Sequence, residues 1–431
     1  MNRKGLILSG AVYLLILTGF AFLAGEILLL TVPLVLYFGL SLLRSPGDLD
    51  LQAEREISSL RSRTGRAVRI RVRVKNRGGR IPLLEISDQI PPGCRVIEGQ
   101  SRWLGRLAAG GAVELRYTVQ PERGYYQFNR LRIVAGDTFG VVKQRQLLEA
   151  AGRFYVHPRY YQIERVAIRP RITNVYSGFI PARVGGPGVE FFGVREYQPG
   201  DPIRWINWRA SARQAQTLFV NQFQQERVAD VGLIVDTRAS SQVHGMRGGS
   251  IFERSIEAAG SLANRFLQDG NRVGLLLYGT SLNWTFPQYG KVQQQRIMDQ
   301  LSRAELGESR VFEKLENLPT QILPRRAQLV FISPLQNQDT ETLVQLTARG
   351  YAVMVISPDP VRYQWEQLDE PDQILEQAYR LARLERRLVL KQLRQAGINV
   401  LDWEPGIPLR SALKVGLSRP IRHPYHGRGL R

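Results

Sequence analysis

Residues 228–405 alternate short apolar runs with longer segments that are apolar on one side, and this alternation limits the possible folds more than any other feature. The runs at 228–235, 272–278, 327–332, 351–356 and 398–403 predict strands, and the segments at 250–268, 291–304, 339–349 and 371–396 predict helices. Repeated strand–helix alternation indicates a mainly parallel sheet with helices on both faces. No GxGxxG or GxxxxGKS/T motif follows these strands, so nucleotide binding through those motifs is not supported.

Two uncharged apolar segments, 6–24 and 27–43, lie at the N-terminus with only Gly25 and Glu26 between them. Each is close to the roughly 20 residues that a helix needs to cross a bilayer. Basic residues precede the first segment and follow the second, so the positive-inside rule puts both ends on the cytoplasmic side. We therefore expect a transmembrane hairpin within 1–45 and a multi-pass protein of the inner membrane, with a buried helical hairpin of a soluble core as the alternative.

In residues 50–160, apolar and polar residues alternate with a period of two, as is typical of strands. Apolar residues at 68, 70, 72 and 74 alternate with basic residues at 69, 71, 73 and 75, which predicts a half-buried strand with one basic face. Further short strands are expected at 83–86, 94–97, 112–119, 131–134 and 139–142. This spacing predicts an immunoglobulin-like β-sandwich. Its basic face could contact lipid headgroups or simply be solvated.

The net charge and the cysteine count restrict which partners and which kinds of site are possible. A formal net charge of +21 suggests a nearby anionic surface, namely nucleic acid, anionic lipid or an acidic protein. The basic residues are spread out and no nucleic-acid motif occurs, so nucleic acid is the least favoured of these. The single cysteine, Cys94, excludes an intramolecular disulfide framework and a multi-cysteine zinc site. A basic, Gly- and Pro-containing segment at 406–431 is expected to be a flexible tail.

A segment rich in Arg and Trp, 188–213, lies in the expected linker at 161–227. It contains the residues Arg195, Glu196, Asp201, Arg204, Trp205, Trp208, Arg209 and Arg213. These side chains could form a docking surface for a partner, because Arg and Trp are enriched in interface hot spots. Alternatively, they could pair with one another as an internal ion network. A general acid–base pair from Glu196 and Asp201 lacks an accompanying nucleophile or metal.

The sequence GVEFFGVREYQPGDPIRWINWRASAR at 188–213 resembles the hallmark of the bacterial "domain of unknown function 58" family. The stretches RGYYQFNRLRIVAGDTFGVVKQ at 123–144 and YVHPR at 155–159 are also similar to that family. The resemblance implies a membrane hairpin, a β-sandwich, the hallmark and then a von Willebrand factor A-like domain at 228–405. It also implies partnership with MoxR-type AAA+ ATPases.

The von Willebrand A fold often binds Mg²⁺ through a DxSxS motif after its first strand, together with an Asp from a later loop. Here the motif reads Asp236-Thr237-Arg238-Ala239-Ser240, and Pro334 lies where that later Asp would be. Two oxygen donors are lost and a cation is gained, which disfavours a hard cation. We therefore expect Asp236 and Ser240 to be a degenerate metal site without a cofactor, and Arg238 to pair with Asp236.

These observations predict a membrane-anchored, non-catalytic adaptor or scaffold that binds a MoxR-type AAA+ ATPase during envelope assembly, maturation or stress response. One alternative is a basic surface module that binds anionic lipid or nucleic acid. Another is an uncharacterised hydrolase that uses Asp201 or Glu196.

Overall fold

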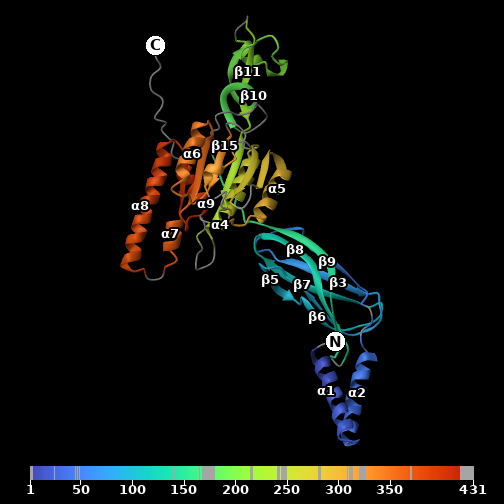
Figure 1. Ribbon diagram of the computed structural model, residues 1–431. Helices are drawn as coiled ribbons and strands as arrows, with labels where there is room; N and C mark the ends of the chain where they lie inside the picture. Colours follow the sequence, from blue (N-terminus) through green and yellow to red (C-terminus); the bar gives the residue numbers. More distant parts are fainter. Residues whose placement is uncertain are drawn as a thin grey trace. The chain divides into compact units, whose positions relative to one another are not determined.

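The computed structural model divides into two compact units, Met1–His157 and Pro158–Arg431 (Figure 1). It describes residues 3–23, 25–43, 45, 47, 49–138, 141–164, 166, 180–213, 217–239, 243, 250–279, 283–307, 309, 314–319, 327–368 and 371–417.

The first unit begins with two helices, α1 (Arg3–Ala21) and α2 (Gly25–Leu43). In the described part of the chain, no helix is both long enough and apolar enough to cross a membrane. The predicted transmembrane hairpin, the inner-membrane location and the fold class built on them are therefore wrong. The helix bounds differ from the expected spans: α1 takes in Arg3 and Lys4 and leaves Phe22 and Leu23 in a turn, while α2 carries Glu26 in its first turn.

The rest of this unit is built from two sheets around one core. The first sheet has the order β1 (Leu51–Ile57), β3 (Val68–Asn76), β7 (Ala112–Pro121) and β5 (Cys94–Gly99), and all its pairs are antiparallel. The second has the order β2 (Arg61–Arg63), β9 (Lys143–His157), β8 (Gly124–Gly136), β4 (Ile81–Asp88) and β6 (Arg102–Leu107), with only the β2–β9 pair parallel. Strict alternation of buried and exposed positions along β3 turns its apolar residues into the core and its basic residues outward, as the period of two predicts.

The core between these sheets contains a buried polar cluster. Arg55 donates a hydrogen bond to Asp88 (Nη2–Oδ1, 2.6 Å), and the Tyr117 hydroxyl donates to the other oxygen of the same carboxylate at 2.5 Å. The Arg55 guanidinium also lies 4.8 Å from the centre of the Phe128 ring. Burial raises the pKa of Asp88, against the opposing effect of Arg55.

The second unit holds a six-stranded sheet with the order β14 (Asn283–Gln288), β13 (Arg272–Tyr278), β12 (Asp230–Asp236), β15 (Gln328–Ile332), β16 (Ala352–Pro358) and β17 (Asn399–Trp403). Every pair is parallel except β13–β14. The four inner strands are buried along almost their whole length, which explains why the sequence shows them as continuous apolar runs.

Helices cover both faces of this sheet. The core on one face joins alternate residues of β12, such as Leu233, to α4 (Ile251–Gln268), α5 (Gly290–Ser302) and α9 (Leu409–Leu417). The core on the other face contains Ile234 and packs against α6 (Asp339–Ala348) and α8 (Gln373–Gln395). A short helix, α7 (Pro360–Trp365), follows β16 and begins at the N-cap Asp359.

Residues 180–227 contain a two-stranded antiparallel pair, β10 (Ile180–Glu196) and β11 (Phe219–Arg227). Between the strands lie a 3-10 turn, η1 (Ile203–Trp205), and a single helical turn, α3 (Trp208–Ser211). Asn207 caps α3 by accepting a hydrogen bond from the Ala210 amide. The segment expected as a linker therefore has regular structure of its own.

Candidate functional site

The candidate site lies at the carboxyl edge of the parallel sheet, between β12 and β15. The helix that follows β12, α4, covers one face of the sheet, whereas the helix that follows β15, α6, covers the other. Connections that diverge in this way leave a crevice outside the strand ends, where α/β proteins commonly bind ligands. Asp236, the last residue of β12, is at this position.

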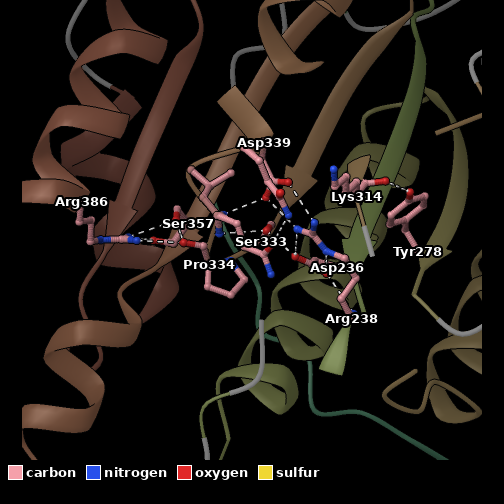
Figure 2. Close-up of polar contacts among 12 residues, drawn as sticks. Asp236, Arg238, Tyr278, Lys314, Ser333, Pro334, Asp339, Ser357 and Arg386 are labelled. Atoms are coloured by element: carbon pink, nitrogen blue, oxygen red, sulfur yellow. Dashed lines mark hydrogen bonds and ion pairs between the residues drawn. The ribbon is translucent and has the colours of Figure 1, made fainter. Parts of the chain in front are cut away.

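The guanidinium of Arg238 occupies this position at the edge of the sheet. Arg238 donates from Nε and Nη2 to the two carboxylate oxygens of Asp236, at 2.9 and 2.7 Å. It also donates from Nη1 and Nη2 to the two oxygens of Asp339, at 3.0 and 2.8 Å. Figure 2 shows the Arg238 side chain lying between the two carboxylates. The predicted Arg238–Asp236 pair is thus confirmed, with Asp339 as a second partner.

The two carboxylates also accept hydrogen bonds from neighbouring groups. The Ser333 hydroxyl, directly after β15, donates to Asp236 at 2.6 Å, and the Gln336 amide donates to Asp339 at 2.9 Å. Asp339 is the first residue of α6, where the helix dipole favours a negative charge. Both acids therefore have donors from the backbone or from hydroxyls in addition to Arg238.

Backbone contacts fix the loop that carries Arg238. The Thr237 amide donates to the Tyr278 carbonyl at 2.8 Å, and the Gly307 amide donates to the Thr237 carbonyl at 2.8 Å. A Cβ on Gly279 would lie 2.4 Å from the Thr237 carbonyl carbon, which is closer than atoms can approach. Gly279, directly after β13, therefore lets the chain pass close to this loop because glycine has no side chain. The loop is therefore held from β13 and from the segment around Gly307.

The cluster is buried and strongly charged. Only 2% of the Arg238 side chain is exposed, and the two carboxylates are equally hidden. Burial by itself favours a neutral Arg238, but the hydrogen bonds and charges of Asp236 and Asp339 outweigh it and raise the pKa of the guanidinium. The positive charge at this position is thus permanent.

Magnesium does not fit this donor set. Asp236 and Asp339 present both of their oxygens to Arg238, and a hard cation between them would face the guanidinium. Among the described residues, no group of three or more His, Cys, Asp or Glu is arranged to hold a metal ion. Ser240, the other expected member of a degenerate metal site, lies outside the described residues.

A second arginine continues the polar edge toward β16 and β17. Arg386 of α8 donates to the carbonyls of Pro334 and Ser357, at 3.0 and 3.1 Å, and to Asp402 at 2.6 Å. Asp359 lies 3.4 Å from its Nε. Pro334 directly follows Ser333, so the two arginine clusters are joined through one short loop, as Figure 2 shows.

The Arg/Trp segment lies elsewhere in the sequence and contains an internal ion pair. Arg195 at the end of β10 donates two hydrogen bonds to Asp201, at 2.7 and 2.5 Å, and the Gln198 amide also donates to that carboxylate. The hydrogen bond from Arg195 lowers the pKa of Asp201 below its ordinary value. This pair closes the turn at Gly200, whose φ of 106° requires glycine.

The other residues of the segment are more accessible. Trp208 is 64% exposed, and Ile203, five positions before it, is also exposed. The side chains of Glu196, Arg204, Arg209 and Arg213 are exposed, and Trp205 is half-buried. We call Ile203, Arg204, Trp208 and Arg209 the Trp208 surface. In the part of the segment whose side chains are described, the Arg195–Asp201 ion pair is thus accompanied by exposed apolar and cationic residues that are close in sequence.

Sequence reasoning missed three members of the buried clusters, namely Ser333, Asp339 and Arg386. Ser333 and Asp339 could have been found, because both follow a predicted strand on the carboxyl side of the sheet. Arg386 carried no such signal, since it lies within a long helix whose other cations are mostly exposed.

Part of the second unit is similar to a known protein family. The family model described as "Protein of unknown function DUF58" matches residues 193–361. The chain contains a DUF58 domain. The domain runs from the end of β10 to the start of α7 and includes both the Trp208 surface and the Arg238 cluster.

Two bacterial proteins that are similar to this chain are described as uncharacterised. The protein YeaD of Bacillus subtilis is 25% identical over 58% of this chain, and the protein Rv1480 of Mycobacterium tuberculosis is 29% identical over 31%. The matched parts span 61% and 41% of these relatives' own lengths. Among solved structures, the CARDB domain of a Pyrococcus furiosus protein matches 25% of the chain with a TM-score of 0.18 and 17% identity, too low a score to support an argument.

Proposed function

We propose that this chain is a non-catalytic protein-binding module, in which the Arg238 cluster fixes the sheet edge and the Trp208 surface contacts the partner. The observation that carries the proposal is the pairing of Arg238 with both Asp236 and Asp339. The crevice where an α/β protein would place a metal or a substrate is filled by the chain's own cation. Buried carboxylates that are already paired with an arginine are poor general bases.

The residues of the Trp208 surface support a role in binding a protein partner and not in catalysis. An accessible tryptophan beside arginines is the composition found in the hot spots of protein interfaces. Asp201, the acid that a hydrolase would need here, is engaged by Arg195 through two hydrogen bonds, and its lowered pKa makes it a weak base. These contacts favour an adaptor over a hydrolase.

For the partner, we propose a MoxR-type AAA+ ATPase. The support is the resemblance of residues 188–213 to the hallmark of the DUF58 family, together with the DUF58 match over 193–361. A von Willebrand A-like arrangement of the DUF58 domain is part of the same proposal, and its mainly parallel sheet with helices on both faces is compatible with it.

The test is direct binding between the purified chain and the MoxR-type ATPase of the same organism, measured by biolayer interferometry. Trp208→Ala should weaken binding by about tenfold or more, the range of a hot-spot residue. Tyr289→Ala is the matched control, because Tyr289 is an equally accessible aromatic residue outside the Trp208 surface. No binding by the wild-type chain, or equal binding by Trp208→Ala, would contradict the proposal.

A further inference from the structure

Helix α8 carries an apolar stripe on its exposed side. Ile374, Leu381, Leu384 and Leu388 are each 54% to 77% exposed. Their spacings of seven, three and four residues put them on one face of the helix, in the pattern that leucine-rich helices use to pair with each other. Four large apolar side chains in one line on an exposed helix indicate a partner.

The stripe is not needed to hold α8 in place. The other side of the helix buries Leu390 and Leu393 in the core of the sheet face covered by α6 and α8. Tyr379 stacks on Trp365 of α7 with ring centres 4.2 Å apart, and Arg386 binds Asp402 of β17. Figure 1 shows α8 at the outer edge of its unit, beside α6 and α7. The helix is thus attached along one face and presents the stripe on another.

The charge beside the stripe identifies the kind of partner. Arg380 and Arg387 are exposed and border the stripe on one side, and Lys391, seven residues after Leu384, continues its line. Arg380 also pairs with Glu376 at 2.6 Å, and the other border has a single acid, Glu385. In coiled-coil pairs, the residues that border the apolar seam select partners by opposite charge. A helix that presents Asp or Glu to this basic border would gain both apolar burial and ion pairs.

We propose that α8 binds an amphipathic helix of another protein, one whose leucine stripe is bordered by acidic residues. This site lies outside the DUF58 match and goes beyond the function proposed above. A second copy of this chain fits less well. In an antiparallel pair the two basic borders would meet, and in a parallel pair the two Lys391 groups would face each other. A membrane surface also fits less well, because the stripe is narrow and α8 is attached to the sheet along its other face.

The test uses the full chain and a synthetic helical peptide of about three leucine heptads with Glu at both borders. The control peptide has the same leucines and Lys in place of Glu. Fluorescence anisotropy should show the acidic peptide binding about tenfold or more tightly than the basic one, a difference of about 1.4 kcal/mol. Double substitution R380E and R387E should reverse this preference.

A second arm tests the stripe itself. Leu381→Gln with Leu384→Gln should abolish binding of the acidic peptide with an unchanged thermal melt, because both side chains are exposed and Gln is a good helix former. Val292→Gln, at an exposed apolar position of α5, should leave binding intact.

Four results would overturn the proposal. The first is equal binding of the two peptides, and the second is peptide binding that survives the double Gln substitution. The third is a dimer of the wild-type chain in sedimentation that the Gln substitutions convert to a monomer, which would assign the stripe to a second copy. The fourth is recruitment to phosphatidylcholine–phosphatidylglycerol vesicles that depends on the same leucines.

Discussion

The guanidinium of Arg238 makes two hydrogen bonds to the carboxylate of Asp339, 101 residues further along the chain. Asp236 makes two more from the opposite side. One side chain therefore ties the end of β12 to the start of α6, across the point where the connections of the sheet diverge. The stability of this edge of the sheet and its affinity for metal ions should therefore depend on the Arg238 guanidinium.

Replacing Arg238 with Met should destabilise the fold strongly. Two buried carboxylates would lose their counter-charge, and the loss of one member of a buried pair costs about 3–5 kcal/mol. Urea unfolding followed by circular dichroism measures the change. Arg213→Met is the control, since Arg213 is exposed and its loss should change the free energy of unfolding by less than about 0.5 kcal/mol. A wild-type-like midpoint for Arg238→Met would show that the cluster does not stabilise the protein.

Restoring oxygen donors should create a cation site. In a double variant with Arg238→Ser and Pro334→Asp, the crevice would hold carboxylates at 236, 334 and 339 with a serine hydroxyl, a set suited to Mg²⁺. The melting temperature of this variant should rise with Mg²⁺, because an ion that binds only the folded state stabilises it. The wild-type melting temperature should not respond. A variant that ignores Mg²⁺ and Mn²⁺ would argue against this location for a cation.

The Arg195–Asp201 pair predicts a pH effect of known sign. The pKa of Asp201 is lowered in the folded state, so its contribution to stability is present above its ordinary pKa of 3.8 and is lost as the pH falls through the lowered value. Carboxyl ¹³C NMR titration should give a pKa below 3.8 for Asp201, and Arg195→Gln should return it toward 3.8. An unchanged titration in Arg195→Gln would mean that the pair does not form in solution.

Cys94 should react slowly with alkylating reagents. Burial raises the pKa of its thiol from 9.0 to about 12, and only the thiolate is nucleophilic. Iodoacetamide labelling at mildly alkaline pH, followed by mass spectrometry, should be far slower for the folded chain than for the chain in urea. Because the folded pKa is the higher one, this group stabilises the fold below pH 9.0, and the contribution is lost as the pH rises through about 12. Equal labelling rates would contradict the burial of the thiol.

The periodic parts of the fold could be predicted from the sequence. The strand expected at 272–278 is β13, and the helix expected at 371–396 is α8 within two residues at its start and one at its end. The alternation at 68–74 correctly indicated which side of β3 is buried. In each case one burial pattern runs through the whole element: continuous in β13, alternating in β3 and one-sided in α8. The pattern and the structure therefore carry the same information.

Other elements have no such period. The strand β9 covers Lys143–His157 with small and charged residues, and no strand was expected there. The pair β10–β11 was expected to be a linker, because its Gly- and Pro-rich first strand lacks the composition typical of strands. The helices α1 and α2 lie where the two apolar segments occur in the sequence. Their apolar composition, however, led to the wrong prediction of a transmembrane hairpin.

The candidate site could be predicted only where its partners are close in sequence. The Arg238–Asp236 pair follows from a spacing of two residues at the end of a strand. Asp339 and Arg386 join the site through the topology of the sheet, which places distant loops at one edge. The predicted strand order places Asp339 on the carboxyl side of the sheet, but its pairing with Arg238, 101 residues away, and the position of Arg386 needed the structure.

A bound ion exchanges with its surroundings, whereas Arg238 is part of the polypeptide and remains for the lifetime of the molecule. Chelators, dilution or a fall in free magnesium would leave this edge of the sheet unchanged. Any regulation of the proposed interaction must then act on other variables, such as how much of the protein is made, how fast it is degraded or how many partner molecules compete for it.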